Sequence, residues 1–343
     1  MKDIKVTLIG LVNVGKPLCR LLAEEERRLA ERCGVRFRLV GVCDSAGCAV
    51  DPEGLDPLEV LRAKEQTGSV SGLAGAGRPG MRADELIRTC GAQMLLECTP
   101  PSLPLGQPGL DHIRTALEYG MDVVTANKSP LAVAWQELFD TAERNGRQLR
   151  FSCAASAGLP TIEMGRFLGQ CDELLEMAGI FNASCQFILE RMAEGDTFEE
   201  GCAAARVGGF LEADPAMDVD GWDVAMKTVI QANAYFGAAV HLDEVACRGI
   251  RDITRADLLE AEAKGEKWMM VGRARKDGDR LILSAGPERL PKDHPLARAN
   301  WCDKALYLKT RTQGEQIHYC LGASASGTPG SVLNDMIAIG QSR

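Results

Sequence analysis

The chain lacks the patterns that mark membrane-spanning, secreted and nucleic-acid-binding proteins. In 343 residues no apolar stretch approaches the ~20 residues that a transmembrane helix needs, and an expected strand begins at once, with no signal peptide before it. Runs rich in lysine and arginine are absent, and the net charge is −9. This charge disfavours nucleic acid and anionic membranes as partners. We therefore expect a cytoplasmic protein.

Metal-binding spacings are also missing. The 13 cysteines include no CxxC pair, and none of the four histidines has a partner at metal-ligand spacing. The cysteines are odd in number and scattered through apolar segments, as at Cys43, Cys98 and Cys153. The sequence therefore predicts free thiols in a reducing compartment, and neither a disulfide framework nor a structural zinc site.

What the chain does contain begins with a strand-helix-strand pattern. Residues 4–10 predict a strand, a helix follows to about Arg32 with Gly34 as its cap, and residues 37–44 predict a second strand. The first turn, GLVNVG, is where a dinucleotide pyrophosphate would rest on a helix N-terminus. It lacks the middle glycine of the usual fingerprint. The cofactor-binding candidates in this turn are Gly10, Val12, Asn13, Val14 and Gly15.

A second informative segment spans residues 208–235. Several acidic residues precede a single lysine, Lys227, and we expect Asp220 to cap a helix that starts at Gly221, with Asp223 in a capping-box position. Asp223 and Lys227 are four residues apart and share one helix face, as an ordinary exposed ion pair also would. Lys227 is, however, the only charged residue from 224 to 240, which predicts a buried helix. A buried ammonium is costly, so we expect that of Lys227 to be paired with a carboxylate or to have a catalytic role.

This segment resembles the substrate signature of homoserine dehydrogenases. The matching positions are Gly209, Glu212, Asp214, Pro215, Asp218, Gly221, Asp223 and Lys227. A second resemblance is TANKSPLA, residues 125–132, which places Lys128 after an expected strand. The likeness extends from Ile4 to Ile339, which leaves no room for an aspartate kinase or a regulatory domain.

The resemblance implies reversible NAD(P)-dependent oxidation of L-homoserine to L-aspartate 4-semialdehyde, a step in threonine, methionine and isoleucine biosynthesis. Lys227 would be the general acid/base, and Lys128 would hold the reacting oxygen beside the cofactor. Asp223 would orient Lys227 or the substrate, and Glu212 would bind the substrate ammonium group. The substrate-binding candidates are Glu212, Asp218, Asp223, Gly209 and Ser184.

The resemblance also assigns cofactor and cation positions. Thr99 and Pro100 would border the nicotinamide, Gly322 lies in a matching glycine-rich turn, and Asp44 would accept hydrogen bonds from the ribose hydroxyls. Many relatives carry an arginine where this chain has Ala46, so NAD is expected over NADP, although Lys64 or Arg62 could still reach a 2′-phosphate. The carbonyls of Ala155, Ala157 and Leu159 match a monovalent-cation loop, in which Ser152 replaces a glutamate.

We therefore predict an α/β fold with a Rossmann-type doubly wound parallel sheet in residues 1–150. An α+β domain for substrate binding and dimerisation follows in residues 151–318, and residues 319–343 would return to the nucleotide-binding domain. Residues 68–80 are rich in glycine and predict a flexible surface connection. A homodimer or homotetramer is expected, because the predicted antiparallel stretches at residues 267–274, 280–285 and 306–312 would supply a dimer surface.

Two alternatives remain open. A related dehydrogenase of another small amino or hydroxy acid is suggested by departures from the family pattern at Val12, Ser152, Ala183 and Gln186. A non-catalytic paralogue that binds nucleotide or amino acid is the other. It is less consistent with the presence of Lys128 and the Asp223/Lys227 pair.

Overall fold

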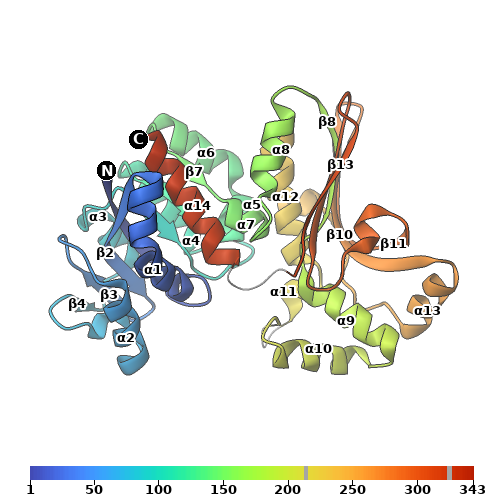
Figure 1. Cartoon of the computed structure of the whole chain (residues 1–343), viewed down its shortest axis with the longest axis horizontal. Coiled ribbons are helices and arrows are strands. Elements are labelled where there is room, and N and C mark those ends of the chain that lie inside the picture. The colour runs from blue at the N-terminus through green and yellow to red at the C-terminus, as the bar shows by residue number, and fades with distance from the viewer. Residues whose placement is uncertain (212–214, 323–326) are drawn as a thin grey trace. The chain divides into compact units, whose positions relative to one another are not determined.

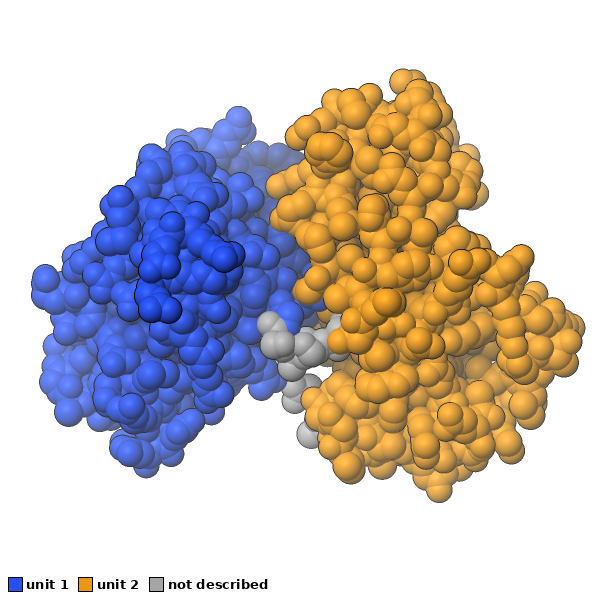
Figure 2. Space-filling view, viewed as in Figure 1, with its two compact units in different colours: residues 1–157, 325–343 blue, residues 158–324 orange. Residues whose placement is uncertain are grey.

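The computed structural model describes residues 1–211, 215–322 and 327–343. The chain forms two compact units, one made of residues 1–157 and 325–343 and the other of residues 158–324 (Figure 2). The predicted domain boundaries lie after residues 150 and 318. The observed boundaries lie after residues 157 and 324, seven and six residues later. The last helix of the chain belongs to the first unit.

The first unit is built on a seven-stranded sheet with the order β4-β3-β2-β1-β5-β6-β7. Strands β2, β1, β5, β6 and β7 run parallel, and β3 and β4 extend one edge in antiparallel pairing. Side chains of β5 and β6 are buried on both faces, as expected for parallel strands covered by helices. The strands are β1 Lys2–Ile9, β2 Val35–Asp44, β3 Gly47–Val50, β4 Gly77–Pro79, β5 Met94–Glu97, β6 Asp122–Thr125 and β7 Leu149–Arg150.

Two groups of helices cover this sheet (Figure 1). Helices α1, α2 and α14 pack together in one group, and α3, α4 and α6 in the other. The predicted doubly wound, Rossmann-type sheet is confirmed. The helices are α1 Gly15–Cys33, α2 Pro57–Thr67, α3 Ala83–Thr89, α4 Gly109–Glu118, α5 Lys128–Val133, α6 Trp135–Arg144, α7 Ser152–Ser156 and α14 Gly327–Ser342.

The glycine-rich connection at residues 68–80 differs from its prediction. It contains a short 3-10 helix, Val70–Gly72, and strand β4, which pairs with β3. A Cβ on Gly77 would collide with the carbonyl oxygen of Ser71. At this position glycine therefore permits close backbone packing at the sheet edge, and the segment adds a strand to the sheet as well as connecting its neighbours.

The second unit contains a six-stranded sheet with the order β13-β12-β8-β10-β11-β9. The predicted antiparallel sheet is confirmed, because every pairing is antiparallel except that of β11 with β9. The strands are β8 Leu174–Ile180, β9 Ala246–Cys247, β10 Glu266–Asp277, β11 Arg280–Pro291, β12 Lys304–Thr310 and β13 Glu315–Cys320.

Helix α12 packs on β8, β10 and β11, and α9 and α13 pack on β10. The apolar core between these helices and the sheet includes Met177, Val224 and Met270. Within the described ranges no helix is both long and apolar enough to cross a lipid bilayer. The helices are α8 Thr161–Gly169, α9 Ala183–Glu194, α10 Phe198–Val207, α11 Ala216–Val219, α12 Trp222–Phe236 and α13 Arg255–Ala263, with short 3-10 turns Leu242–Glu244 and Pro295–Arg298.

Candidate active site

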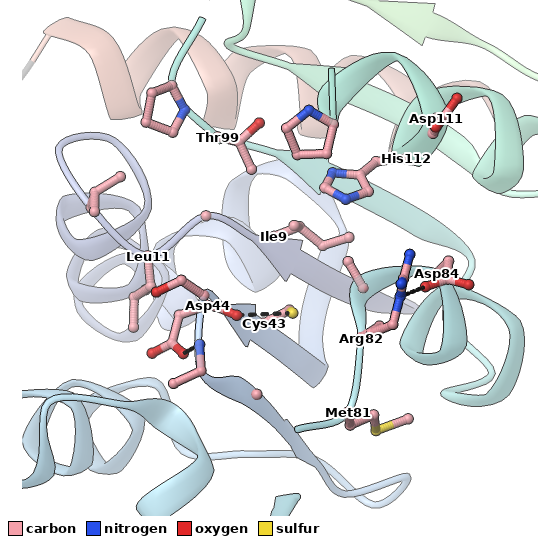
Figure 3. A pocket seen from close by; sticks show the side chains of 18 of the residues that line it. Ile9, Leu11, Cys43, Asp44, Met81, Arg82, Asp84, Thr99, Asp111 and His112 are labelled. Carbon is pink, nitrogen blue, oxygen red and sulfur yellow. Dashed lines mark hydrogen bonds and ion pairs between the residues drawn. The ribbon is translucent and has the colours of Figure 1, made fainter. Parts of the chain in front are cut away.

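The first unit has a pocket of about 900 Å³ at the carboxyl ends of its central parallel strands (Figure 3). Residues that follow β1, β2 and β5 line it, and α3 and α4 contribute further side chains. Open parallel sheets bind ligands at this edge, where the strand order reverses. The predicted cofactor residues that line the pocket are Gly10, Val12, Asp44, Thr99 and Pro100.

The turn between β1 and α1 needs both of its glycines. Gly10 has φ +95°, and a Cβ there would lie 2.5 Å from the carbonyl carbon of Cys98. A Cβ on Gly15 would collide with the carbonyl oxygen of Gly10. Val12, in place of the middle glycine, is 42% exposed and lines the pocket. Its side chain therefore meets whatever occupies the pocket at this turn.

Helix α1 begins without a side-chain cap. Val14 is its N-cap residue and makes no capping hydrogen bond through its side chain, and the first helical turn contains no acidic residue. The first backbone N–H groups of a helix lack intrahelical acceptors and carry partial positive charge. This end of α1, which Asn13 directly precedes, is therefore suited to an anion such as a pyrophosphate.

Asp44 is the last residue of β2, and its carboxylate oxygens already accept four hydrogen bonds from the protein. Oδ1 accepts from the backbone N–H of Ala46 at 3.0 Å and from the Ser69 hydroxyl at 2.9 Å. Oδ2 accepts from Lys64 Nζ at 2.8 Å and from the Val70 N–H at 2.9 Å. An ionised carboxylate offers about four lone-pair sites. Ribose hydroxyls can therefore bond to Asp44 only by sharing or displacing these donors.

The charge of Asp44 is balanced by Lys64 of α2. Burial acts to raise the pKa of Asp44, but the hydrogen bonds from Lys64 and the backbone outweigh it and lower that pKa. Arg62, the other cation considered from the sequence, pairs with Glu59 on the exposed side of α2. Lys64 is thus the cation of α2 that lines the pocket.

At the end of β5, a buried pair that sequence reasoning missed joins the pocket wall to the interior: His112 lines the pocket and Glu97 lies behind it. Glu97 is fully buried and His112 of α4 nearly so, with His112 Nδ1 3.4 Å from Glu97 Oε1. Thr99 donates to the same oxygen through its hydroxyl and its N–H. A charged residue inside the apolar run MLLEC is the signal that could have pointed to Glu97.

Lys128 is the first residue of α5 and follows the carboxyl end of β6. Asn127 caps this helix, since its side-chain oxygen accepts from the Ser129 N–H at 3.1 Å. The Lys128 side chain is half-buried. The cap and the strand end fix where its backbone lies, in the region where parallel sheets place their ligands.

In the second unit, the residues predicted for catalysis form one hydrogen-bonded group. Lys227 Nζ donates to Asp223 Oδ2 and to the carbonyl oxygen of Phe181, both at 2.7 Å. Asn182 Nδ2 donates to Asp223 Oδ2 at 2.9 Å and to Asp218 Oδ1 at 2.5 Å. The Lys227 side chain is only 13% exposed, so the exposed ion pair that spacing alone allows is excluded.

The predicted cap of α12 is wrong. The helix begins at Trp222, and Gly221 is the N-cap with φ +91° and no side-chain bond. A Cβ on Gly221 would lie 2.9 Å from the carbonyl oxygen of Arg248, so tertiary packing requires glycine there. Asp220 pairs instead with Arg251. Asp223 is thereby used by Lys227 and Asn182 rather than by a capping box.

Two of the remaining substrate candidates, Ser184 and Gly209, lie in described parts of the second unit. Ser184 of α9 donates from its hydroxyl to the carbonyl oxygen of Phe210 at 2.6 Å, which ties α9 to the segment containing Gly209. Gly209 has φ +77°, a conformation that favours glycine. Glu212, predicted to bind the substrate ammonium, lies outside the described residues, as does Asp214. Asn182, which lies two residues before Ser184, is not among the site residues predicted from the sequence.

Gly322 belongs to the second unit, and the residues proposed for the cation loop are divided between the two units. The Gly322 N–H donates to Asp303 Oδ1 at 2.8 Å in the second unit. Ala155 lies in α7 and Ala157 follows it in the first unit, whereas Leu159 belongs to the second. Within the described ranges no three His, Cys, Asp or Glu side chains gather as metal ligands.

Ser152 stands where the family resemblance expects a glutamate. Its hydroxyl and N–H donate to the two oxygens of Asp335 in α14, at 2.9 Å and 2.8 Å. Asp335 is buried, and both residues belong to the first unit. Ser152 therefore binds a carboxylate from α14 instead of supplying one to a cation.

A Rossmann-type sheet with a ligand pocket, followed by a unit with a buried lysine-carboxylate pair, defines an NAD(P)-dependent oxidoreductase. Comparison with known families agrees. Residues 10–152 match the model of the homoserine dehydrogenase NAD-binding domain, and residues 160–337 match the homoserine dehydrogenase model. The chain belongs to the homoserine dehydrogenase family.

Two relatives of this family are similar over nearly their full length. The chain is 31% identical to an NAD(+)-dependent homoserine dehydrogenase of Pseudomonas canavaninivorans, covering 100% of this chain and 97% of that protein. It is 31% identical to the homoserine dehydrogenase of Methanocaldococcus jannaschii, covering 97% and 98%. Among solved structures, homoserine dehydrogenase of Thermoplasma acidophilum superposes with TM-score 0.85 at 26% identity, covering 98% of this chain and 99% of that one.

A second solved structure bears on the cofactor. A hyperthermophilic archaeal homoserine dehydrogenase in complex with NADPH superposes with TM-score 0.83 at 26% identity, covering 98% of this chain and 97% of that one. One relative is thus named for NAD and another was solved with NADPH. The nucleotide-binding unit of this chain is an NAD(P)-binding domain.

Proposed function

We propose that this chain transfers hydride reversibly between L-homoserine and NAD(P), with Lys227 as the proton donor and acceptor. The observation that carries this role is the arrangement of the Lys227 ammonium. It uses two of its three N–H donors on Asp223 and Phe181, and the third has no protein acceptor among the described residues. That donor is available for a substrate oxygen.

The chemistry requires such a group. Oxidation of an alcohol removes the hydroxyl proton as the hydride leaves, and reduction of the aldehyde needs a proton for the forming alkoxide. The nicotinamide, when bound, accepts or supplies the hydride. Lys227 takes the proton in one direction and returns it in the other. Asp223 stabilises the protonated form and fixes the position of Nζ.

We assign Lys128 to the reacting oxygen. Its ammonium would favour the negative charge of the developing alkoxide. For the substrate ammonium group we propose the acidic segment that contains Glu212, with Asp218 held beside Asp223 by Asn182. An amino-acid substrate needs an anion there, and this segment supplies several.

For the cofactor we propose a modest preference for NAD. A 2′-phosphate at the end of β2 would approach Asp44, and the turn that follows offers Ala46 in place of a cation. Lys64 neutralises Asp44 but adds no net positive charge to the pair. A monovalent cation remains a weaker proposal, since Ser152 supplies no carboxylate to it.

We further propose that the enzyme works in a cytoplasm as a homodimer or homotetramer. Its 13 cysteines are all free thiols in the described residues, which is consistent with a reducing compartment. The six-stranded sheet has a second apolar cluster that includes Ile180, Val271 and Tyr307, with Ile317 and Tyr319 packed against it. This cluster is buried within the chain itself, so the proposal that this unit supplies subunit contacts rests on the family resemblance.

The test is homoserine-dependent formation of reduced cofactor, with NAD and NADP in parallel. Lys227→Ala is expected to lower kcat by about 10²- to 10⁴-fold, the usual contribution of a general acid/base. Lys309→Ala is the control, because Lys309 forms an exposed pair with Glu315 in the same unit. Wild-type turnover of another small amino or hydroxy acid with none of homoserine would overturn the proposed substrate.

A further inference from the structure

Glu97 is a buried acid that the proposed mechanism does not use. It ends β5, a strand whose other residues are Met94, Leu95 and Leu96, and its exposed fraction is zero. Its Oε2 has no hydrogen-bond partner among the described residues. Burying a carboxyl group costs free energy that an apolar side chain would not. Packing alone therefore gives no reason for an acid at this position.

The contacts of Glu97 explain what it does. Oε1 accepts from the Thr99 hydroxyl and from the Thr99 N–H at 3.3 Å. His112 Nδ1 lies 3.4 Å from the same oxygen. Thr99 and His112 both line the pocket, whereas Glu97 lies behind them. The carboxyl group thus fixes two side chains of the pocket wall from the interior of the protein.

The hydrogen bonds continue from Thr99 to the helix that carries Lys128. Asn127 Nδ2 donates to Thr99 Oγ1 at 3.0 Å and to the carbonyl oxygen of Pro100 at 3.3 Å. Asn127 Oδ1 then accepts from the Ser129 N–H and caps α5. A threonine hydroxyl has one proton. Because that proton goes to Glu97, the Asn127 amide must present its NH₂ group to Thr99 and its oxygen to the helix.

Asn127 is closely packed against the start of α4. Asn127 is buried, and a Cβ on Gly109, the first residue of α4, would lie 2.6 Å from its Nδ2. The Ser129 hydroxyl also accepts from the Ser102 N–H at 2.7 Å, which ties α5 to the segment after β5. A change at Glu97 is therefore passed to Asn127 through hydrogen bonds rather than absorbed by loose packing.

We propose that Glu97 is a positioning residue for Lys128. An acceptor at the end of β5 sets the orientation of Thr99, Thr99 sets that of the Asn127 amide, and Asn127 fixes the first turn of α5, where Lys128 begins. This assignment rests on the proposed function, because it takes Lys128 to hold the reacting oxygen. Placement of a group that stabilises the transition state within a fraction of an ångström affects kcat more than binding.

Two near-isosteric variants break the chain of bonds at different links. Glu97→Gln replaces one carboxyl oxygen by an NH₂ group, which competes with the remaining oxygen for the position beside the Thr99 hydroxyl. Thr99→Val removes the hydroxyl and keeps the shape, while Thr99→Ser restores it. We expect Glu97→Gln and Thr99→Val each to lower kcat about tenfold, and Thr99→Ser to recover most of the kcat that Thr99→Val loses, because serine keeps the hydroxyl.

Binding and folding are measured in parallel. The Kd of NAD, from calorimetry, is expected to change less than about threefold in Glu97→Gln. Its thermal midpoint is expected to shift by less than about 4 °C. A lower kcat at unchanged NAD affinity and stability is a result that a purely structural role does not produce. A fall in thermal midpoint that accounts for the lost activity would overturn the proposal.

The decisive measurement is a double-mutant cycle with Lys128→Ala. If Glu97 acts through Lys128, Glu97→Gln and Thr99→Val lower kcat less than about twofold in the Lys128→Ala background. Full multiplicative losses in that background overturn the positioning role and leave the function of Lys128 intact. Wild-type kcat in Lys128→Ala alone overturns the assignment of Lys128, and this inference with it.

Discussion

Two lysines of this protein, one in each unit, make the same kind of contacts, but their surroundings differ. Lys64 donates to Asp44 and to the carbonyl oxygen of Gly68, both at 2.8 Å. Lys227 donates to Asp223 and to the carbonyl oxygen of Phe181, both at 2.7 Å. Each ammonium is thus bound by one carboxylate and one carbonyl. Each also keeps one N–H donor without a protein acceptor in the described residues.

The carboxylates show where the two pairs differ. Asp44 also accepts from two backbone N–H groups and from the Ser69 hydroxyl, so it fastens the segment after α2 to the end of β2. Asp223 accepts from Asn182, which also holds Asp218. The Asp44/Lys64 pair forms hydrogen bonds mainly with backbone groups, and both residues line the pocket. The second pair joins the side chains proposed for substrate binding and proton transfer, and Asp223 holds the ammonium of Lys227.

The largest expected difference between the two pairs is in kcat, when Asp44 and Asp223 are each replaced by asparagine. Asp223→Asn removes the negative partner of Lys227, and we expect kcat for homoserine to fall about 10²-fold, with the Kd of NAD unchanged. Asp44→Asn is the matched change in the other pair and is expected to leave kcat within about twofold at saturating NAD. Steady-state kinetics with both variants check this. Equal losses of kcat would remove the distinction between the pairs.

A smaller effect is expected from the residue that joins the acids of the second unit. Asn182→Asp preserves a good N-cap for α9 but puts a third carboxylate between Asp218 and Asp223. Loss of a hydrogen bond to a charged group costs about 2 kcal/mol, so kcat/KM for homoserine should fall about 30-fold. Asn145→Asp adds the same charge at an exposed helix end and serves as the control. Unchanged kcat/KM in Asn182→Asp would show that the acids act independently.

The two pairs also differ in how far the sequence could predict them. Asp223 and Lys227 are four residues apart on one helix, so spacing alone placed them together. Asp44 and Lys64 are 20 residues apart, and α2 brings them together only after it packs against the end of β2. The sequence identified Asp44 for a ribose and Lys64 for a phosphate, but it could not show that each is the partner of the other.

The same limit explains the other misses. The parallel sheet and its first helix follow from local patterns of apolar residues and glycine, and these predictions are confirmed. Gly221 displaced Asp220 as the cap because the carbonyl oxygen of Arg248 approaches it from a distant segment. Glu97 contacts His112 of α4, and Asn127 contacts Thr99, which lies 28 residues earlier; the sequence shows no pattern that predicts either contact.

The Asp44/Lys64 pair can be tested through cofactor selectivity, where we expect a smaller change in KM. Lys64→Met leaves Asp44 without its balancing ammonium, so repulsion of a 2′-phosphate increases and the KM for NADP should rise about fivefold. The KM for NAD should change less than about twofold, because NAD has no such phosphate. Arg62→Met, on the exposed side of the same helix, is the control. A lower KM for NADP in Lys64→Met would contradict the proposed balance of charge.

The smallest effect concerns stability and pH. The pKa of Asp44 is lowered in the folded protein, so its ionised form stabilises the fold above its unfolded pKa of about 3.9, and this contribution is lost as pH falls through the folded pKa. Asp44→Asn should therefore cost on the order of 1 kcal/mol of unfolding free energy at neutral pH and progressively less below about pH 4. Denaturant unfolding at several pH values measures this, with Asp51→Asn as control, since Asp51 accepts the N–H of Glu53 in a nearby turn. A cost that stays constant as the pH falls would mean that Asp44 stabilises the pocket edge by shape and hydrogen bonding alone, and that its charge serves only to bind Lys64.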